Sequence, residues 1–316
     1  MEQNKRMKMI EAAKMYYILD YNQSEIAKKL GVSRPTVSRF LQQAKNEGIV
    51  QITIHDPTEN IEALERNLVE KYQLQKVVVG SVPCFEEELI KKALGEKAAE
   101  YLYKTITDGD TIGVAWGTTI YHVAQELKQK YWKGVKVVQL KGGVSHSETH
   151  TYASEILHLF GKAFHTNPHH LPLPAIVDHV LVKRAMETDQ HIRKILEMGR
   201  QANVAVFTVG VSSSDSLLFQ LGYFSDEDAK IISSKAVGDI SSRFFNEDGN
   251  ICHPDLNSRT LGIELEELKR KEKSILVAGG APKLEAIYGA LKGRFANVLV
   301  TDQYTAKLLL DKTEDK

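Results

Sequence analysis

Apolar and polar positions in the first part of the chain follow the period of short helices. Apolar residues recur at helical spacing over residues 10–19, and this segment ends near Asn22. A second helix is expected to begin at Ser24, whose hydroxyl is a good helix cap. Gly31 then suits the left-handed backbone that ends many helices. The pattern predicts two short helices followed by a tight turn.

A third helix is predicted directly after this turn. Ser33 caps it, Pro35 lies in its first turn, where a missing N–H group costs nothing, and it runs from Arg34 to about Lys45. Residues 49–54 then alternate apolar and polar side chains like a strand. Three helices with a glycine turn form a helix-turn-helix, and the strand would make it a winged variant. We therefore expect a first domain over residues 1–56.

The remainder of the chain, residues 57–316, alternates strand-like and helical segments after a connecting helix at 61–73. The predicted strands are 77–79, 111–115, 135–140, 204–209, 274–278 and 298–300, with helices at 88–104, 118–130, 213–222 and 282–292. Such alternation is typical of an open α/β domain with a largely parallel sheet. Because these sheets bind ligands beyond the carboxyl ends of their strands, the loops that directly follow strands hold the candidate site.

Composition narrows the class of protein. A chain of 316 residues favours at least two domains, and 42% apolar with 26% charged residues is typical of a soluble protein. No apolar run approaches the roughly 20 residues of a membrane span, and the N-terminus lacks a secretory signal, so we expect a cytoplasmic protein without membrane partners. Cys84 and Cys252 stand far apart, which argues against a disulfide framework or a zinc finger.

Charge points to a nucleic-acid partner for the first domain. Residues 1–55 carry nine basic and five acidic residues, a balance of +4 in a chain whose total is zero. In a helix-turn-helix, residues at the start of the second helix contact base edges in the major groove, and arginine is a frequent partner of guanine. The alternative is a three-helix packing module without nucleic acid, which exposed arginines beside hydroxyls disfavour. The candidate DNA-binding residues are Ser33, Arg34, Pro35, Thr36, Ser38 and Arg39.

A candidate phosphate site follows the second predicted strand. Gly117 is followed by Thr118 and Thr119 at the start of a predicted helix. Backbone N–H groups at such a helix start, together with the hydroxyls, are suited to a phosphate. The alternative is a tight strand-to-helix turn with no ligand. The motif is neither a P-loop nor a dinucleotide fingerprint, because the spacing and the P-loop lysine are missing.

Two lysines follow other predicted strands. Lys141 stands at an apolar strand end, where partial desolvation lowers the pKa of an amine and makes it a nucleophile toward an aldehyde. It is equally suited to pairing with a phosphate or to lying exposed. Lys283 follows glycines at a helix start and suits the anionic end of a ligand, or it is a solvated lysine after a glycine turn.

Three further features stay open. His146 and His150, with Glu148 between them, could bind a metal ion, as could the cluster His165, His169 and His170, but loop or surface histidines explain both groups, and no metal is expected. Asp239 either faces a ligand or caps a turn.

The motifs occur in one order along almost the whole chain: Gln23–Ala27, Ser33–Arg39, Val114–Thr119, Thr208–Val211 and Val277–Gly280. This order resembles the SorC/DeoR-type sugar-binding transcriptional regulators. The resemblance implies a Rossmann-like effector domain similar to sugar-phosphate isomerases and glucosamine-phosphate deaminase, kept for binding rather than turnover. Trp116 departs from the glycine-rich loop of the isomerases, which puts turnover in doubt.

The resemblance also implies how an effector is held. The effector-binding candidates are Gly117, Thr118, Thr119, Gln139, Gly280 and Lys283. Among them, Gly117, Thr118, Thr119 and Lys283 would hold the effector phosphate. In the DeoR-like branch the effector looks like deoxyribose 5-phosphate, and Lys141 forms a reversible Schiff base with its open-chain aldehyde. Members that bind hexose phosphates imply no covalent step.

Together with the resemblance, these features predict a homo-oligomeric repressor, a dimer or tetramer, of genes for deoxyribonucleoside or related nucleoside catabolism. A phosphorylated sugar would release it from double-stranded operator DNA, without a cofactor. The alternative is a sugar-phosphate aldolase or isomerase with a DNA-binding appendage, motivated by Lys141 as an imine-forming group. Such an enzyme needs a general acid and base around its lysine, and the sequence shows no convincing pair near Lys141.

Overall fold

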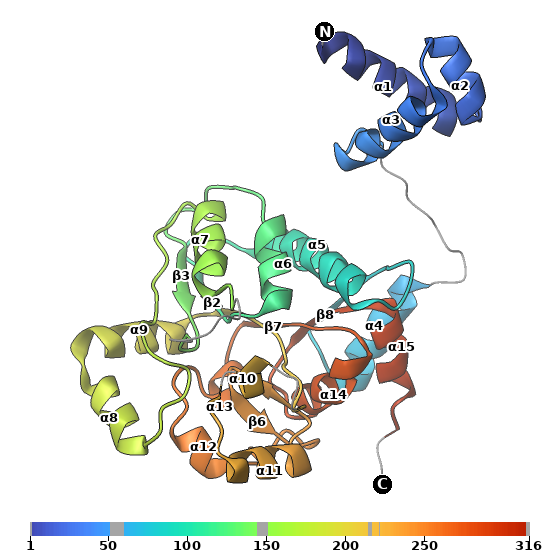
Figure 1. Cartoon of the computed structure of the whole chain (residues 1–316). Helices are drawn as coiled ribbons and strands as arrows, with labels where there is room; N and C mark the ends of the chain where they lie inside the picture. The colour runs from blue at the N-terminus through green and yellow to red at the C-terminus, as the bar shows by residue number, and fades with distance from the viewer. Residues whose placement is uncertain (1, 51–59, 144–150, 214–216, 221, 314–316) are drawn as a thin grey trace. The chain divides into compact units, whose positions relative to one another are not determined.

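The structure is a computed structural model that describes residues 2–50, 60–143, 151–213, 217–220 and 222–313 (Figure 1). Its contacts divide the chain into two compact units, residues 1–59 and 60–316. The predicted domain boundary at residues 56 and 57 and most of the predicted strand 49–54 lie outside the described residues. That boundary and the winged variant therefore stay predictions.

The smaller unit holds α1 (Glu2–Tyr17), α2 (Gln23–Leu30) and α3 (Arg34–Asn46). The cap of α2 is Asn22 rather than Ser24: the Asn22 side chain accepts the N–H groups of Ser24 and Glu25, and the Glu25 carboxylate accepts the Asn22 N–H in return. Gly31 ends α2 with a φ of 62°, as its position predicts.

Ser33 caps α3 by accepting the N–H of Thr36, and Pro35 lies in the first turn, as expected. The three helices enclose a small core of their own, which contains Met9, Ala12, Ala13, Ile26, Ala27, Leu30, Val37, Phe40, Leu41 and Ala44. The helix-turn-helix is therefore a packed unit.

In the larger unit, all six predicted strands form one sheet with the order β1-β8-β7-β4-β2-β3. Every neighbouring pair is parallel. The strands are β1 (Lys76–Gly80), β2 (Thr111–Val114), β3 (Lys136–Gln139), β4 (Val204–Phe207), β7 (Lys273–Val277) and β8 (Val298–Asp302). The apolar runs of the sequence therefore read correctly as buried parallel strands.

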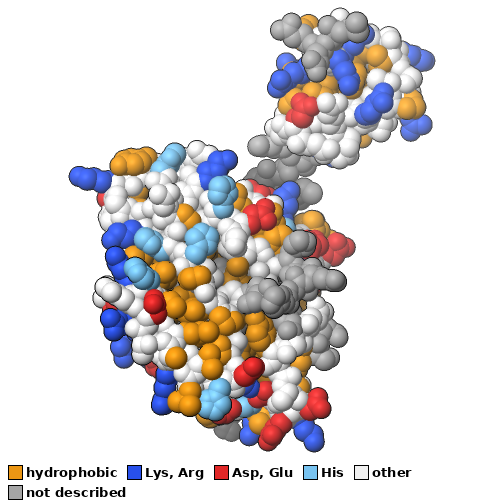
Figure 2. Space-filling view, turned by 60° about the vertical axis from the view of Figure 1, so that its left-hand side comes forward, with side chains coloured by type: hydrophobic (Ala, Val, Ile, Leu, Met, Phe, Trp, Pro, Cys, Tyr) orange, Lys and Arg blue, Asp and Glu red, His pale blue; other side chains and the backbone are white. Residues whose placement is uncertain are grey.

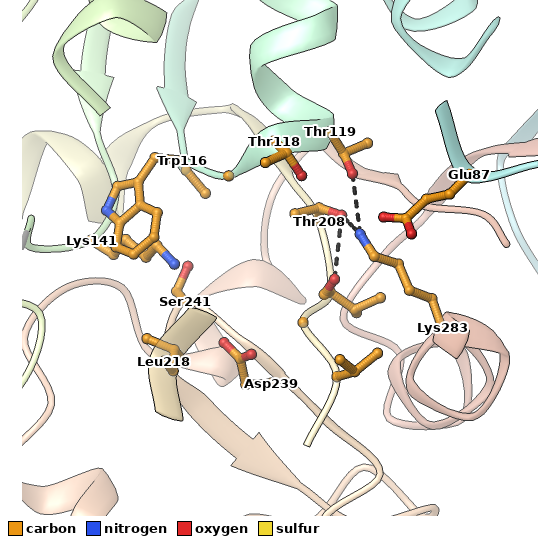
Figure 3. Close-up of a pocket in the computed structure, with 15 residues that line it drawn as sticks. Glu87, Trp116, Thr118, Thr119, Lys141, Thr208, Leu218, Asp239, Ser241 and Lys283 are labelled. Carbon is orange, nitrogen blue, oxygen red and sulfur yellow. Dashed lines mark hydrogen bonds between the residues drawn. The ribbon is translucent and has the colours of Figure 1, made fainter. Parts of the chain in front are cut away.

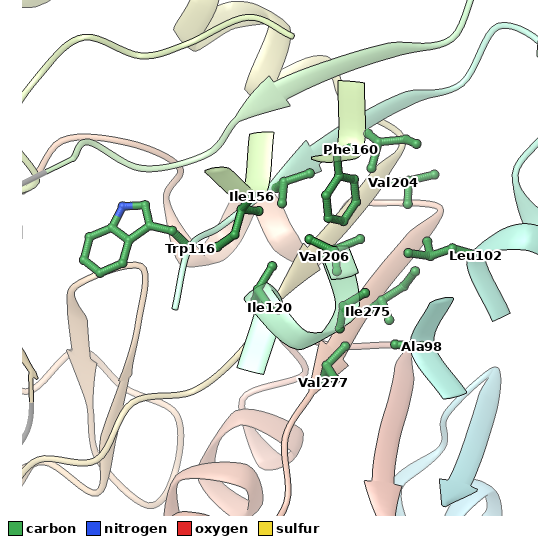
Figure 4. Close-up of a cluster of buried hydrophobic side chains, with 14 of the residues drawn as sticks. Ala98, Leu102, Trp116, Ile120, Ile156, Phe160, Val204, Val206, Ile275 and Val277 are labelled. Carbon is green, nitrogen blue, oxygen red and sulfur yellow. The ribbon is translucent and has the colours of Figure 1, made fainter. Parts of the chain in front are cut away.

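Alternation along the strands divides the hydrophobic core between the two faces of the sheet. Val204 and Val206 of β4 join one buried cluster, whereas Ala205 and Phe207 join the other. The first cluster is covered by α5 (Glu87–Thr105), α6 (Thr118–Glu126) and α7 (Ala153–Ala163) (Figure 4). The second is covered by α4 (Ile61–Tyr72), α14 (Leu284–Lys292) and α15 (Gln303–Asp311). Both faces are thus protected from water.

Several predicted helices differ in extent or role. The expected connecting helix is α4, which buries Leu68 against the sheet and so belongs to the larger unit. The segment expected at 118–130 ends at Glu126. Of the described residues in the predicted 213–222 helix, only 217–220 are helical, as α10 (Leu217–Gln220). The predicted helix 282–292 divides into a 3-10 turn, Ala281–Lys283, and α14.

The remaining elements lie in segments where the sequence pattern predicted nothing. They are α8 (Val180–Thr188), α9 (Gln190–Gln201), α11 (Asp226–Lys235), β5 (Gly238–Ile240), β6 (Arg243–Phe245), α12 (Pro254–Ser258) and α13 (Leu265–Leu268). β5 and β6 form an antiparallel hairpin apart from the main sheet. No helix in the described part of the chain is both long and apolar enough to cross a membrane.

Candidate functional site

A cavity of about 280 Å³ lies where four strands of the main sheet end. Its walls come from the segments after β2, β3, β4 and β7 and from the β5–β6 hairpin (Figure 3). The chain forms β3 on one side of β2 and then β4 on the other, and open α/β sheets bind ligands at such a reversal. The lining residues are Glu87, Ala115, Trp116, Gly117, Thr118, Thr119, Lys141, Thr208, Val209, Gly210, Val211, Leu218, Asp239, Ser241 and Lys283.

One end of this cavity is suited to an anion. α6 begins after Gly117, whose φ of 147° favours glycine, and no described side chain caps the helix. Its first N–H groups therefore present the positive end of the helix dipole to a ligand. Lys283 Nζ donates to Thr119 Oγ1 at 3.1 Å and to Thr208 Oγ1 at 3.4 Å. A helix start, a cation and two hydroxyls thus converge (Figure 3).

Burial makes the positive charge on Lys283 unfavourable unless an opposite charge lies beside it. Burial lowers the pKa of Lys283 to about 8 and the neighbouring Lys91 lowers it as well, whereas Glu87 and Asp239 raise it. Glu87 also forms an ion pair with Lys91, in which Glu87 Oε1 and Lys91 Nζ lie 2.7 Å apart. Because an opposite charge within a few ångströms favours the ammonium form, a phosphate bound at this end would raise the pKa of Lys283.

Lys141 lies at the other end of the cavity, directly after β3. It is 6% exposed, and its Nζ lies 3.4 Å from the centre of the Trp116 ring. A hydrogen bond of 2.8 Å from Trp116 Nε1 to the Gly142 carbonyl fixes that ring. Burial lowers the pKa of Lys141 to about 8, although the charge of Asp239 raises it. At pH 7, roughly one tenth of the protein molecules therefore have a neutral Lys141 amine, which is the form that attacks an aldehyde.

Asp239 caps a turn, as one of the two alternatives for this residue expected, and it also lines the cavity; a contact with a ligand stays a prediction. It lines the wall, and its Oδ2 accepts the N–H of Ser242 at 2.8 Å. Burial raises the pKa of Asp239, while Lys141 and the bond from Ser242 lower it. A Cβ atom at Gly210 would lie 2.0 Å from Asp239 Oδ1, so only glycine at that position leaves room for the carboxylate.

A buried arginine fixes the hairpin that carries Asp239. Arg243 is 1% exposed, its Nε donates to the Ile263 carbonyl at 2.7 Å, and it pairs with Glu264 at 2.8 Å. The segment it holds also contains Gly262, which forms a β-bridge with Lys141. Residues 262–264 thus hold both the hairpin and the backbone of Lys141, and so fix the two cavity walls at the Lys141 end.

Five of the predicted effector-site residues, Gly117, Thr118, Thr119, Lys141 and Lys283, line the cavity. Gln139 and Gly280 do not. The Gln139 side chain donates to the Lys141 carbonyl at 2.7 Å and accepts the N–H of Leu171, so it fixes the backbone that carries Lys141. The Gly280 N–H donates to Thr305 Oγ1 at 2.8 Å, which commits it to the fold.

Sequence reasoning assigned no role to Thr208, Ser241 or Leu218. Thr208 carried a partial signal, because its hydroxyl stands near the end of the predicted strand 204–209; β4 ends at Phe207, so Thr208 directly follows the strand, where ligands bind. Ser241 and Leu218 carried none, since they belong to a hairpin and a short helix whose positions depend on long-range packing. Of the histidine groups, His146 and His150 lie outside the described residues. Within the described ranges, no group of three potential metal ligands is close enough together to hold an ion.

The predicted DNA-binding residues gather on the start of α3. Ser33, Arg34, Pro35, Ser38 and Arg39 are exposed, and Thr36 is half-buried. The first turn of α3 has no acidic residue. A basic, exposed helix start of this kind is suited to phosphate and base contacts in the major groove.

A helix-turn-helix joined to an α/β domain whose cavity is suited to an anion is the arrangement of a ligand-responsive transcription regulator. Residues 56–311 match the family model of a sugar-binding domain, and residues 6–66 match a Crp-like helix-turn-helix domain. The chain therefore belongs to the SorC-type sugar-binding transcriptional regulators, and the resemblance seen in its motifs is confirmed.

Individual relatives agree with this family. The chain is 51% identical over 98% of its length, and 99% of the relative's, to a protein from Bacillus subtilis (strain 168) named deoxyribonucleoside regulator. It is 31% identical to the sorbitol operon regulator of Klebsiella pneumoniae, over 96% of this chain and 97% of that one. The crystal structure of that full-length regulator, SorC, superposes with a TM-score of 0.77 and 30% identity over 96% of this chain and 98% of the other. The predicted fold class is thus confirmed.

Proposed function

We propose that this protein represses genes for deoxyribonucleoside or related nucleoside use, and that deoxyribose 5-phosphate releases it from its operator. The proposal rests on one arrangement: a buried amine and an anion site at opposite ends of one cavity (Figure 3). An open-chain sugar phosphate carries an aldehyde at one end and a phosphate at the other. The relative named deoxyribonucleoside regulator supports the choice of a deoxyribose derivative.

The covalent step at Lys141 is an imine condensation. The neutral amine adds to the aldehyde carbon, which forms the C–N bond and gives a carbinolamine. Its hydroxyl leaves as water when it takes up a proton, and the C=N bond forms. Overall, the lysine ammonium group and one aldehyde give one iminium ion and one water molecule. Asp239, in the same cavity wall, is the described carboxylate suited to accept and return the proton.

Borohydride trapping tests the effector and the chemistry together. Purified protein is reduced in the presence of deoxyribose 5-phosphate, ribose 5-phosphate or free deoxyribose, and intact mass with peptide mapping locates the adduct. We expect an adduct at Lys141 with deoxyribose 5-phosphate and little with the other two sugars. The lack of an adduct with any sugar would exclude the imine and leave a non-covalently bound sugar phosphate.

Release from DNA requires that the effector binds the DNA-free arrangement more tightly than the DNA-bound one, and the coupling is reciprocal. The test is operator binding, on fragments selected by the protein from genomic DNA, with and without effector. We expect affinity for the operator to fall by roughly 10- to 100-fold at saturating effector, a typical coupling strength. An operator that stays fully bound contradicts induction but not DNA binding.

We further propose that Arg34 and Arg39 read the operator from the start of α3. Each is exposed on the predicted recognition helix. Replacing either by alanine is expected to weaken operator binding by about 10- to 100-fold and to leave borohydride trapping unchanged, because a base contact by arginine contributes about 1–3 kcal/mol. Arg193→Ala, an exposed arginine of α9, is the matched control. An equal loss of operator affinity in all three variants would mean that the arginines act through general electrostatic attraction and not through base contacts.

We also propose a homo-oligomer that places pairs of helix-turn-helix units on operator half-sites. Hydrophobic side chains gather on one face of the larger unit (Figure 2). α8 contributes apolar surface to the exterior, with Leu181 62% and Val182 42% exposed. Such surface is typical of subunit contacts. Analytical ultracentrifugation of the protein and of Leu181→Glu checks this, and a monomeric wild-type protein would refute it.

The alternative is a sugar-phosphate aldolase or isomerase, and one observation favours it: Asp239 supplies a carboxylate in the same cavity wall as Lys141. The relatives are named as regulators, and we propose that this chain too is not an enzyme. The test is steady consumption of deoxyribose 5-phosphate by purified protein, followed by product analysis. Binding without consumption supports the regulator, whereas turnover that depends on Lys141 supports the enzyme.

A further inference from the structure

Ser241 presents a hydroxyl that has no partner within the described part of the chain. Its side chain is 4% exposed and lines the cavity, yet its Oγ makes no hydrogen bond there. Figure 3 shows the Ser241 hydroxyl on the side of the cavity where Lys141 enters. A buried polar group without a partner is unfavourable, and native structures leave few of them. Ser242 Oγ likewise has no hydrogen-bond partner among the described residues, but Ser241 is the one of the two that lines the cavity, where a ligand can supply the missing hydrogen bond.

The backbone around Ser241 is held in an uncommon conformation. Ser241 and Ser242 have φ values of 53° and 67° in the turn that joins β5 to β6. Two-residue hairpin turns of this kind normally use Asn-Gly or Gly-Gly, because left-handed backbone disfavours other side chains. The hydrogen bond that the Ser242 N–H donates to Asp239 Oδ2 and those that Arg243 donates hold the turn in place. Strain that is maintained in this way gathers at binding sites.

The remaining surroundings of Lys141 offer few polar contacts. The Trp116 ring covers Lys141 Nζ, and Leu218 lines the wall nearby. The phosphate-binding groups, Lys283 with Thr119 and Thr208, lie at the far end. Among the described lining residues, Ser241 and Asp239 are thus the polar side chains that a sugar meets beside Lys141.

We propose that Ser241 determines effector specificity by hydrogen bonding to the sugar hydroxyl nearest the carbonyl carbon, which is O3 in deoxyribose 5-phosphate. This inference rests on the proposed function. Its Oγ–H and lone pairs match a hydroxyl, which both donates and accepts. C2 of a 2-deoxy sugar carries no hydroxyl, so its methylene faces the Trp116 ring without losing a hydrogen bond. The first polar atom after the imine carbon is then O3.

The test pairs variants with matched ligands. Dissociation constants are measured by calorimetry for deoxyribose 5-phosphate and for 2,3-dideoxyribose 5-phosphate, with wild-type protein and with Ser241→Gly, which removes the hydroxyl and suits the positive φ. We expect wild-type protein to bind the dideoxy sugar about 5- to 10-fold more weakly, the usual contribution of a neutral hydrogen bond. Ser241→Gly is expected to bind both sugars with the same weakened affinity.

Ser242→Gly is the matched control, because Ser242 lies in the same turn with the same backbone but outside the cavity wall. We expect this variant to keep wild-type discrimination between the two sugars. The proposal is overturned if Ser241→Gly still discriminates, or if Ser242→Gly loses discrimination to the same degree. Borohydride trapping of wild-type protein is the separate readout. No adduct with deoxyribose 5-phosphate excludes the imine of the proposed function, whereas an adduct with unchanged discrimination defeats only the role of Ser241.

Discussion

Lys141 and Lys283 line the same cavity and share a pKa lowered by burial to about 8, but their surroundings differ. Lys283 donates to two threonine hydroxyls at the start of α6, where an anion is favoured. Lys141 lies over an aromatic ring with a carboxylate nearby. A lowered pKa alone therefore does not separate a nucleophile from a binding cation. The neighbouring atoms do, because hydroxyls and a helix start stabilise a bound anion, whereas an aromatic wall leaves an amine free to react.

The largest expected effect removes the nucleophile. Lys141→Met should abolish the borohydride adduct, because no other described lysine combines this cavity position with an apolar wall. Lys283→Met should still form an adduct at Lys141 at high sugar concentration. Intact mass spectrometry measures both. An adduct of undiminished yield in Lys141→Met would remove the distinction between the two lysines.

The second effect separates phosphate from aldehyde. Lys283→Met should weaken binding of deoxyribose 5-phosphate by roughly 10- to 100-fold, since hydrogen bonds to a charged group contribute about 1.5–3 kcal/mol. Binding of free deoxyribose should change by less than about twofold. Calorimetric titration with the two sugars gives the comparison. An equal loss for both sugars would mean that Lys283 supports the fold and not the phosphate.

A third effect concerns pH. The rate of adduct formation should rise with pH and level off with a midpoint near 8, the pKa of Lys141, because only the neutral amine attacks. The charge of Asp239 raises that pKa, so Asp239→Asn should move the midpoint below 8. Trapping rates from pH 6 to pH 10 measure it. A midpoint that moves upward would show that Asp239 acts on Lys141 in another way.

The smallest effect is on stability. Lys141 has a lower pKa in the folded protein than its ordinary 10.5, so the charged amine destabilises the fold below pH 8, and this cost fades between pH 8 and 10.5. Lys141→Met should therefore raise the free energy of unfolding by roughly 1–2 kcal/mol at pH 7 and by less at pH 9.5. Urea denaturation at both pH values checks it. Lys283→Met should gain less, because Thr119 and Thr208 lose a partner.

Much of this molecule follows from local sequence signals. Buried apolar runs located all six strands of the main sheet, and glycines with hydroxyls after β2 located the start of α6. The rule that ligands bind at strand ends then led to Lys141 and Lys283. These features depend on short stretches whose periodicity or turn chemistry leaves few alternatives.

Other features depend on contacts between distant segments. Asp239 and Ser241 reach the cavity on a hairpin that Arg243 ties to a segment about 20 residues further along the chain. Gln139 has the position expected of a ligand contact, but its amide satisfies the backbone of Lys141 instead. The cap of α2 is Asn22 and not the predicted Ser24, because Asn22 forms a capping box with Glu25. Each outcome was decided by which hydrogen-bond partner lay within reach in three dimensions.

The parallel sheet behind the cavity has a further consequence for how effectors are told apart. Lys283 follows β7 and Lys141 follows β3, and these strands are separated by β4 and β2, which amounts to three strand spacings or about 14 Å. Hydrogen bonds between neighbouring strands fix this spacing of the strand ends. In the proposed complex, the sheet thus sets the distance between the aldehyde end of the sugar at Lys141 and its phosphate end at Lys283. Evolution toward shorter or longer effectors would have to move the lysines themselves.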